Sequence, residues 1–215
     1  MVLDGLGGLP HPNTGLTELE SARTPNLNEL ARQGIVGLSE PIGPGITPGS
    51  GPGHLSLFGY DPVASNIGRG ALSALGIGLR LNSNDVAVRL NFCTLDQDGN
   101  VEDRRAGRIS TEKNRELIAT LSQIAVGDIE IKLETESQHR AVLVLSGEGL
   151  HPGVQETDPQ MVGVPPLEPT ALAPAANRTA TLLQEFLDGV RRLIGESQPA
   201  NFVLMRGYAG LPRLE

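Results

Sequence analysis

The segment at positions 41–69, PIGPGITPGSGPGHLSLFGYDPVASNIGR, surrounds Ser50 with glycine and proline and then changes into a short apolar helical pattern. The flanking glycines let the backbone adopt positive φ and let another group approach closely. Pro52 suits the first turn of a helix, where its missing N–H costs nothing. A hydroxyl at such a corner lies beside unpaired helix amides, which favour negative charge. The pattern predicts a phosphate beside Ser50, with an ordinary surface turn as the alternative.

A Walker-type phosphate loop is excluded, because no Lys-Ser or Lys-Thr pair follows these glycines. With 215 residues, 39% of them hydrophobic, the chain is long enough for one large domain or two small ones. The net charge of -8 argues against nucleic acid as a partner. No apolar run reaches the length of a membrane span and no signal peptide is recognisable, so we expect no membrane partner and a cytoplasmic location.

The single cysteine, Cys93, excludes an internal disulfide, fits a reducing compartment and is predicted to be a small core residue. The positive charge comes from fifteen arginines and two lysines. Codon bias is one explanation. The other is a binding role, since arginine grips carboxylates and phosphates with two parallel hydrogen bonds.

The first part of the chain contains one candidate metal ligand and one clear helix. Residues 1–5 resemble the end of a short buried strand, which would place Asp4 where ligands bind in open α/β sheets; a turn-capping role is the alternative. Residues 24–34 predict a helix that begins after Thr24 and ends at Gly34. Residues 35–38 are predicted to form a second short strand.

The composition changes after Arg69, and we place a domain boundary near Leu75. Residues 85–94 alternate with period two, which predicts a strand whose polar face carries Arg89 and Asn91 and is either solvated or lines a cleft. A hairpin turn at 97–100 leads to the segment DRRAGR at 103–108.

The remaining elements predict a compact α/β unit. Helices are expected at 111–124 and 175–194, and strands at 129–134, 141–145 and 202–205. A long loop at 147–173 contains His151 and Asp158, and loops of this length are often functional.

Five segments together strongly resemble the archaeal-type, cofactor-independent phosphoglycerate mutases of the alkaline phosphatase superfamily. They are VLDGLGG, ARTPNLNELARQG, GPGITPGSGPGHLSLFGYDP, DRRAGR and SQHRAVLVLSGEGL. The resemblance implies an α/β fold, with residues 1–75 as the N-terminal part of an alkaline-phosphatase-like three-layer core. Residues 76–206 would be an inserted substrate-binding α/β domain, and residues 207–215 would return toward the catalytic domain.

The resemblance also implies the chemistry. Ser50 would accept the phosphoryl group of 3-phosphoglycerate and return it to the 2-hydroxyl, without 2,3-bisphosphoglycerate. Two divalent metals, Mn²⁺ or alternatively Mg²⁺, would assist, with Asp4 and Ser50 as ligands and His54 as a supporting residue. The small-molecule substrate would be held by six side chains of the inserted domain: Arg89, Asn91, Asp103, Arg105, Arg108 and Arg206.

The chain departs from the family pattern after Arg206, where the C-terminal block of Asp and His metal ligands is expected and does not follow. We therefore expect this chain to bind divalent metal weakly and to lack mutase activity. Two alternatives stay open: a phosphatase, phosphopentomutase or sulfatase-like hydrolase of the same superfamily, and a non-catalytic binding domain. The sequence leaves the oligomeric state open.

Overall fold

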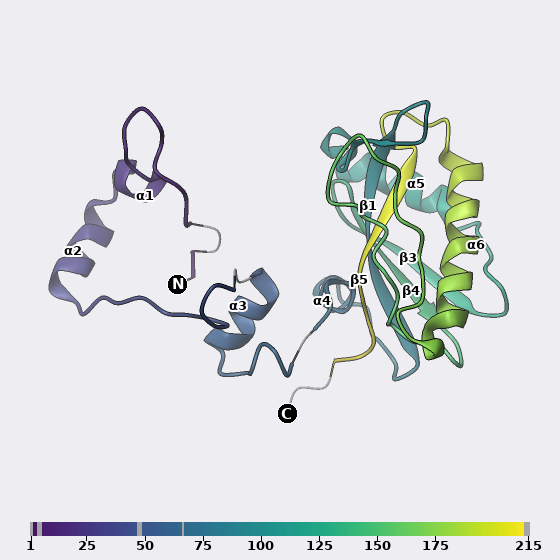
Figure 1. The fold of residues 1–215 in the computed structure, drawn as a ribbon, viewed down its shortest axis with the longest axis horizontal. Coiled ribbons are helices and arrows are strands. Elements are labelled where there is room, and N and C mark those ends of the chain that lie inside the picture. The colour runs from purple at the N-terminus through teal and green to yellow at the C-terminus, as the bar shows by residue number, and fades with distance from the viewer. Residues whose placement is uncertain (1, 4–5, 47–48, 66, 213–215) are drawn as a thin grey trace. The chain divides into compact units, whose positions relative to one another are not determined.

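The computed structural model describes residues 2–3, 6–46, 49–65 and 67–212, which form two compact units, residues 1–66 and residues 67–215 (Figure 1). The predicted boundary near Leu75 falls inside helix α4 (Arg69–Gly76). The division comes earlier because α4 packs on strands β1 (Asp85–Leu95) and β5 (Phe202–Ala209) and so belongs to the second unit.

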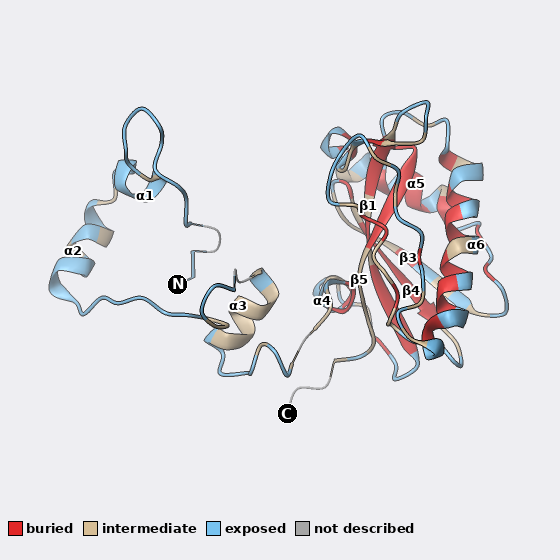
Figure 2. Cartoon of the chain, in the orientation of Figure 1, coloured by how far each residue is buried: buried red, intermediate tan, exposed pale blue. Residues whose placement is uncertain are grey.

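The described residues of the first unit form three helices: α1 (Glu18–Ser21), α2 (Pro25–Gln33) and α3 (Ser50–Leu57). Helix α2 confirms the helix predicted at 24–34. The strand predicted at 35–38 is wrong, because these residues have no regular secondary structure and the described residues of this unit include no strand for them to pair with. None of the described residues of this unit is buried (Figure 2). Asp4 lies outside the described residues.

The second unit is built on an antiparallel sheet. Its other strands are β2 (Val101–Asp103), β3 (Glu130–Ser137) and β4 (Arg140–Ser146). Strand β1 lies between β4 and β5, β3 pairs with the other edge of β4, and β2 pairs with the end of β1. Helices α5 (Thr111–Leu121) and α6 (Asn177–Ile194) complete the predicted order of elements, and short 3₁₀ turns lie at Ala106–Arg108 and Pro174–Ala176.

The main core lies between one face of the sheet and helices α5 and α6 (Figures 1 and 2). The period-two pattern of β1 is confirmed, since Val86, Val88, Leu90 and Phe92 are all buried in this core. Cys93 is fully buried as predicted, and burial raises the pKa of its thiol. A buried, protonated thiol is a structural group rather than a nucleophile.

The opposite face of the sheet is covered at one end by α4. Ala71 and Ala74 of the helix pack on Ala87, Val142 and Val144 in a second, smaller core. The close approach requires glycine at position 70, where an added Cβ would lie 2.2 Å from the Ala87 carbonyl oxygen. Beyond α4, this face carries Arg89 and Asn91 of β1, Arg140 of β4 and Arg206 of β5, and we call it the polar face.

The predicted long loop at 147–173 is confirmed, and it runs along the free edge of β5. The Thr157 backbone N–H donates to the Met205 carbonyl at 3.0 Å, and the Met205 N–H donates to the Thr157 hydroxyl at 2.8 Å. This attachment places Glu156 and Asp158 beside the polar face of the sheet. No helix within the described residues is both long and apolar enough to span a membrane.

Candidate anion-binding cleft

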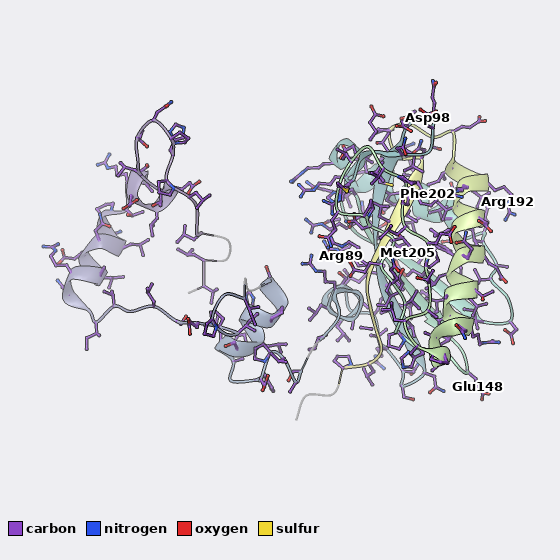
Figure 3. The ribbon with its side chains drawn as sticks, viewed as in Figure 1. Arg89, Asp98, Glu148, Arg192, Phe202 and Met205 are labelled. Atoms are coloured by element: carbon purple, nitrogen blue, oxygen red, sulfur yellow. The ribbon has the colours of Figure 1, made fainter. Side chains whose placement is uncertain are left out.

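The second unit contains a cleft of about 180 Å³ on the polar face of the sheet. Seven arginines, one histidine and one asparagine line it: Arg69, Arg89, Asn91, Arg104, Arg105, Arg108, His139, Arg140 and Arg206. Figure 3 shows Arg89 on the side of the sheet away from α6, which carries Arg192. Such a concentration of guanidinium groups favours an anionic ligand.

Strand register creates the floor of this cleft. Arg89 on β1 lies opposite Arg206 on β5, and Asn91 on β1 lies opposite Arg140 on β4. Residues directly opposite each other in an antiparallel pair project from the same face of the sheet. The sequence left open whether the polar face of β1 is solvated or lines a cleft. The structure shows that Arg89 and Asn91 on this face line a cleft.

A left-handed turn after β2 forms one wall. Ala106, Gly107 and Arg108 all have positive φ, at 47°, 62° and 55°. The Asp103 carboxylate holds this turn by accepting the backbone N–H of Arg105 at 2.8 Å and that of Gly107 at 2.6 Å. The turn thereby presents Arg105 and Arg108 to the cleft.

Carboxylates of the second unit orient four of the arginines. Asp158 accepts two hydrogen bonds from Arg104, at 2.8 and 2.7 Å, and lies 3.3 Å from Arg206. Glu156 also pairs with Arg206, and Glu136 lies 3.8 Å from Arg89 and 3.5 Å from Arg140. The two hydrogen bonds to Asp158 fix the Arg104 guanidinium in place before a ligand arrives, and the other carboxylates attract their arginines as close ion pairs.

The Asp158 side chain is fully buried. Burial alone would raise the pKa of its carboxyl, but the hydrogen bonds from Arg104 and from the Gln160 N–H, with the charge of Arg206, outweigh burial and lower that pKa. Asp158 therefore stays ionised and acts as an internal counter-ion for two cleft arginines.

Three arginines of the cleft, Arg69, Arg105 and Arg108, have no acidic partner within 4.0 Å among the described residues. Two buried atoms in the cleft, Arg89 Nε and Asn91 Oδ1, also make no hydrogen bond with the described chain. Burial, followed by the charges of Arg140, Arg69 and Arg206, lowers the pKa of Arg89 against the opposing effect of Glu136. An added anion would accept a hydrogen bond from Arg89 Nε and relieve the repulsion among the arginines, whereas Asn91 Oδ1 could only accept a hydrogen bond from a donor group of a ligand.

His139 lies in the turn between β3 and β4 and also lines the cleft. Only 4% of the residue is exposed, and its Nδ1 atom has no hydrogen-bond partner within the described chain. Burial lowers the pKa of the imidazole to about 4, with further lowering from Arg140, Arg105, Arg108 and Arg89. The ring is therefore neutral near pH 7.

Ser50 belongs to the first unit and is the first residue of α3, as the glycine pattern predicts. The residue is exposed. His54 lies one turn later, and its Nδ1 is 2.6 Å from the Ser50 carbonyl oxygen. A carbonyl can only accept, so Nδ1–H of His54 is the donor.

The structure brings five of the six predicted substrate-binding residues together in the cleft: Arg89, Asn91, Arg105, Arg108 and Arg206. Asp103 does not line it and instead holds the adjoining turn. Sequence reasoning missed Arg69, Arg104, His139 and Arg140. The period-two pattern of 141–145 could have found Arg140, since extending that strand by one residue places it on the polar face.

Within the described residues, no group of three or more His, Cys, Asp or Glu side chains is arranged to hold a metal ion. Ser50 and His54 alone do not make a metal site, because divalent cations in proteins take four to eight ligands. The cleft is the candidate site that the described residues form, and its positive charge favours an anionic ligand.

Comparisons with known proteins identify the family to which the chain belongs. The family model for 2,3-bisphosphoglycerate-independent phosphoglycerate mutase matches residues 31–201. A probable 2,3-bisphosphoglycerate-independent phosphoglycerate mutase of Thermus thermophilus is 50% identical over 214 residues, which are 99% of this chain and 53% of that relative. The chain spans about half the length of the curated relatives it matches.

Two solved structures are also similar. The cofactor-independent phosphoglycerate mutase from Thermoplasma acidophilum is 36% identical with a TM-score of 0.63, over 98% of this chain and 58% of that one. The PH0037 protein from Pyrococcus horikoshii is 31% identical with a TM-score of 0.72, over 99% of this chain and 51% of that one. Since the family model covers most of the sequence, the chain belongs to the 2,3-bisphosphoglycerate-independent phosphoglycerate mutase family.

Proposed function

We propose that the whole protein interconverts 3-phosphoglycerate and 2-phosphoglycerate through a phosphoserine at Ser50, in the cytoplasm. In this proposal, residues 67–215 bind the anionic groups of the substrate. The observation that carries it is the cleft in which seven arginines converge, three of them without an acidic partner among the described residues.

The substrate chemistry suits this cleft. Phosphoglycerate carries a carboxylate and a phosphate on a three-carbon chain, and both groups accept paired hydrogen bonds from a planar guanidinium. The arginines held by Glu136 and Asp158 give the cleft a fixed shape, while Arg69, Arg105 and Arg108 supply uncompensated positive charge. A neutral ligand would leave that charge without a counter-ion.

The proposed step at Ser50 is a phosphoryl transfer. The Ser50 Oγ forms a bond to phosphorus as the bond to the glycerate 3-oxygen breaks, and the serine proton passes to that oxygen. In the second step the 2-hydroxyl attacks the phosphoserine, and the proton it loses returns to Ser50. The glycine-flanked position at the start of α3 supports the proposal, since a helix N-terminus stabilises a phosphate.

Two divalent cations, Mn²⁺ or Mg²⁺, with Asp4 and Ser50 among the ligands, are part of the proposal for the whole protein. Such ions would neutralise charge on the transferring phosphoryl group. The described residues alone do not fit a complete metal site. We propose accordingly that the 215-residue chain binds Mn²⁺ weakly and has no mutase activity.

Calorimetric titration of the 215-residue chain with 3-phosphoglycerate tests the binding role. We expect the double variant Arg105→Ala/Arg108→Ala to bind at least about tenfold more weakly, because each lost charge-assisted hydrogen bond is worth about 1.5–3 kcal/mol. Arg192→Ala is the matched control: Arg192 is exposed on α6 and does not line the cleft. Equal affinity for all three proteins would contradict the proposal.

The proposed catalytic role of Ser50 is tested in the complete protein with Mn²⁺. Ser50→Ala should abolish mutase turnover and covalent labelling by phosphoglycerate carrying radioactive phosphate. Release of inorganic phosphate in place of 2-phosphoglycerate would identify a hydrolase of the same superfamily instead. Full turnover of Ser50→Ala would exclude the phosphoserine route.

A further inference from the structure

His139 is the least accessible of the side chains that line the cleft on the polar face, with 4% of the residue exposed. Buried polar atoms in folded proteins nearly always have a partner. The Nδ1 atom of His139 has none within the described chain. A buried, unpartnered nitrogen in the wall of an arginine-lined cleft indicates that its partner is a ligand.

The backbone around His139 is held in place by a buried side chain. Asn114 of α5 is fully buried, and its Nδ2 donates to the carbonyl oxygens on either side of His139, those of Gln138 at 2.6 Å and Arg140 at 2.9 Å. The Thr135 hydroxyl donates to Asn114 Oδ1, and the His139 carbonyl accepts the Phe92 N–H at 2.7 Å. The turn is therefore rigid before any ligand binds.

The charged groups around the ring are nearly all positive. Arg89 of β1, Arg140 of β4, and Arg105 and Arg108 of the turn after β2 act on it. On β3, Glu136 is paired with Arg89 and Arg140. In the empty cleft these arginines oppose protonation of His139. An anion would neutralise them and accept a hydrogen bond from the ring.

We infer that His139 contacts the bound anion through Nδ1–H and takes up a proton when the anion binds. This inference rests on the proposed function of the cleft and adds a pH-dependent contact to it. The proton comes from solvent, so anion affinity rises as the pH falls. The direction follows because the empty protein keeps the ring neutral, whereas the anion stabilises the imidazolium.

Sulfate is a suitable probe, because it keeps its double charge between pH 5.5 and 7.5 and cannot itself supply or take up the proton. Calorimetric titrations of the 215-residue chain at pH 5.5, in buffers with different ionisation enthalpies, measure the protons bound. We expect the original chain to take up most of one proton and to bind sulfate about tenfold more tightly at pH 5.5 than at pH 7.5.

The variant His139→Asn keeps an N–H donor near the position of Nδ1 but cannot titrate. It should bind sulfate with little proton uptake and without the pH dependence, and His139→Ala should also bind more weakly at pH 7.5. The control His151→Asn changes an exposed histidine of the long loop that does not line the cleft, and it should behave as the original chain.

The outcomes separate this inference from the proposed function. If sulfate and 3-phosphoglycerate bind but proton uptake is absent, or is the same in His139→Asn, the inference is wrong and the binding function stands. If neither anion binds the original chain, the proposed binding function fails, and this inference fails with it.

Discussion

Asp103 shows how a single carboxylate can support a positively charged site by holding the backbone of an adjoining turn. Ala106 and Arg108 adopt left-handed backbone conformations that cost a non-glycine residue about 1 kcal/mol each. The two hydrogen bonds that Asp103 accepts from the turn offset this cost and position Arg105 and Arg108. The structure indicates a positioning role for Asp103, and the contact with substrate that the resemblance implies stays a prediction.

This role predicts a counterintuitive effect of Asp103→Ala. Removing a negative charge beside a cation-rich cleft should strengthen anion binding if charge alone mattered. We expect about fivefold weaker binding of 3-phosphoglycerate, equivalent to about 1 kcal/mol, because the turn loses its hydrogen bonds. Calorimetry measures the change. Asp98→Ala, which removes an exposed carboxylate from the β1–β2 turn, is the control, and tighter binding by Asp103→Ala would contradict the assignment (Figure 3).

Asp158 acts on stability as well as on geometry. Asp158→Asn leaves Arg104 and Arg206 without their buried counter-ion, and we expect the free energy of unfolding to fall by about 3 kcal/mol. Urea denaturation at pH 7 measures the loss. Asp128→Asn breaks the exposed pair with Arg178 and should change stability by less than about 1 kcal/mol. Equal effects of the two substitutions would contradict the buried role.

The contribution of Asp158 to the free energy of unfolding depends on pH. The pKa of Asp158 is lower in the folded protein than in the unfolded chain, so its contribution is present above the unfolded pKa. It is lost as the pH falls through the folded pKa. The difference in stability between the original chain and Asp158→Asn should therefore shrink below about pH 4.

Helix α4 shows that packing can override helix propensity at the scale of an element. Alanine is a better helix former than glycine by about 1 kcal/mol. Gly70 nevertheless lies where a Cβ would come within 2.2 Å of the Ala87 carbonyl oxygen. The helix can approach β1 closely only because this side chain is absent, and Arg69, the preceding residue, reaches the cleft as a result.

Alanine substitutions at Gly70 and Gly76 separate the effect of helix propensity from the effect of close packing against β1. Gly70→Ala should lower the free energy of unfolding by about 1–3 kcal/mol through overpacking and should weaken 3-phosphoglycerate binding by shifting Arg69. Gly76→Ala, in the same helix with no atom within 4 Å of an added Cβ, should be neutral or slightly stabilising. Urea denaturation compares the two, and a stabilising Gly70→Ala would show that α4 is not held against the sheet.

At the scale of the whole molecule, the stabilising interactions are concentrated in one unit. Both hydrophobic cores consist of residues from 67–215, and none of the described residues before Gly70 is buried. Every described residue that lines the cleft also lies in this unit. The unit at 67–215 therefore contains both hydrophobic cores and the described residues of the cleft to which we assign anion binding.

We predict that residues 67–215, expressed alone, unfold in a single cooperative transition and bind 3-phosphoglycerate within about threefold of the affinity of the 215-residue chain. Circular dichroism and calorimetry measure the two properties. Arg105→Ala/Arg108→Ala in the same fragment serves as the control for specific binding. A fragment that folds but does not bind would place essential binding groups in residues 1–66.

The sequence by itself determined the elements whose signals are local. The period-two pattern of 85–94, the apolar stripes of α5 and α6 and the Thr24–Gly34 helix boundaries each follow from neighbouring side chains, and the structure confirms them. The family could also be inferred, because the glycine-rich segment around Ser50 is specific. The strand expected at 35–38 shows the limit of local signals, since a strand exists only with a partner to pair with.

Only the tertiary structure added Arg69, Arg104, His139 and Arg140 to the cleft and showed how its side chains come together. Arg89, Arg140 and Arg206 meet through antiparallel register, and Arg104 is held by Asp158 from a loop more than fifty positions away. His139 gains its significance from burial and from an unpartnered nitrogen, neither of which has a sequence signal. The physical reason is that charge and hydrogen bonding act over distances in space, and the fold sets those distances between residues that are remote along the chain.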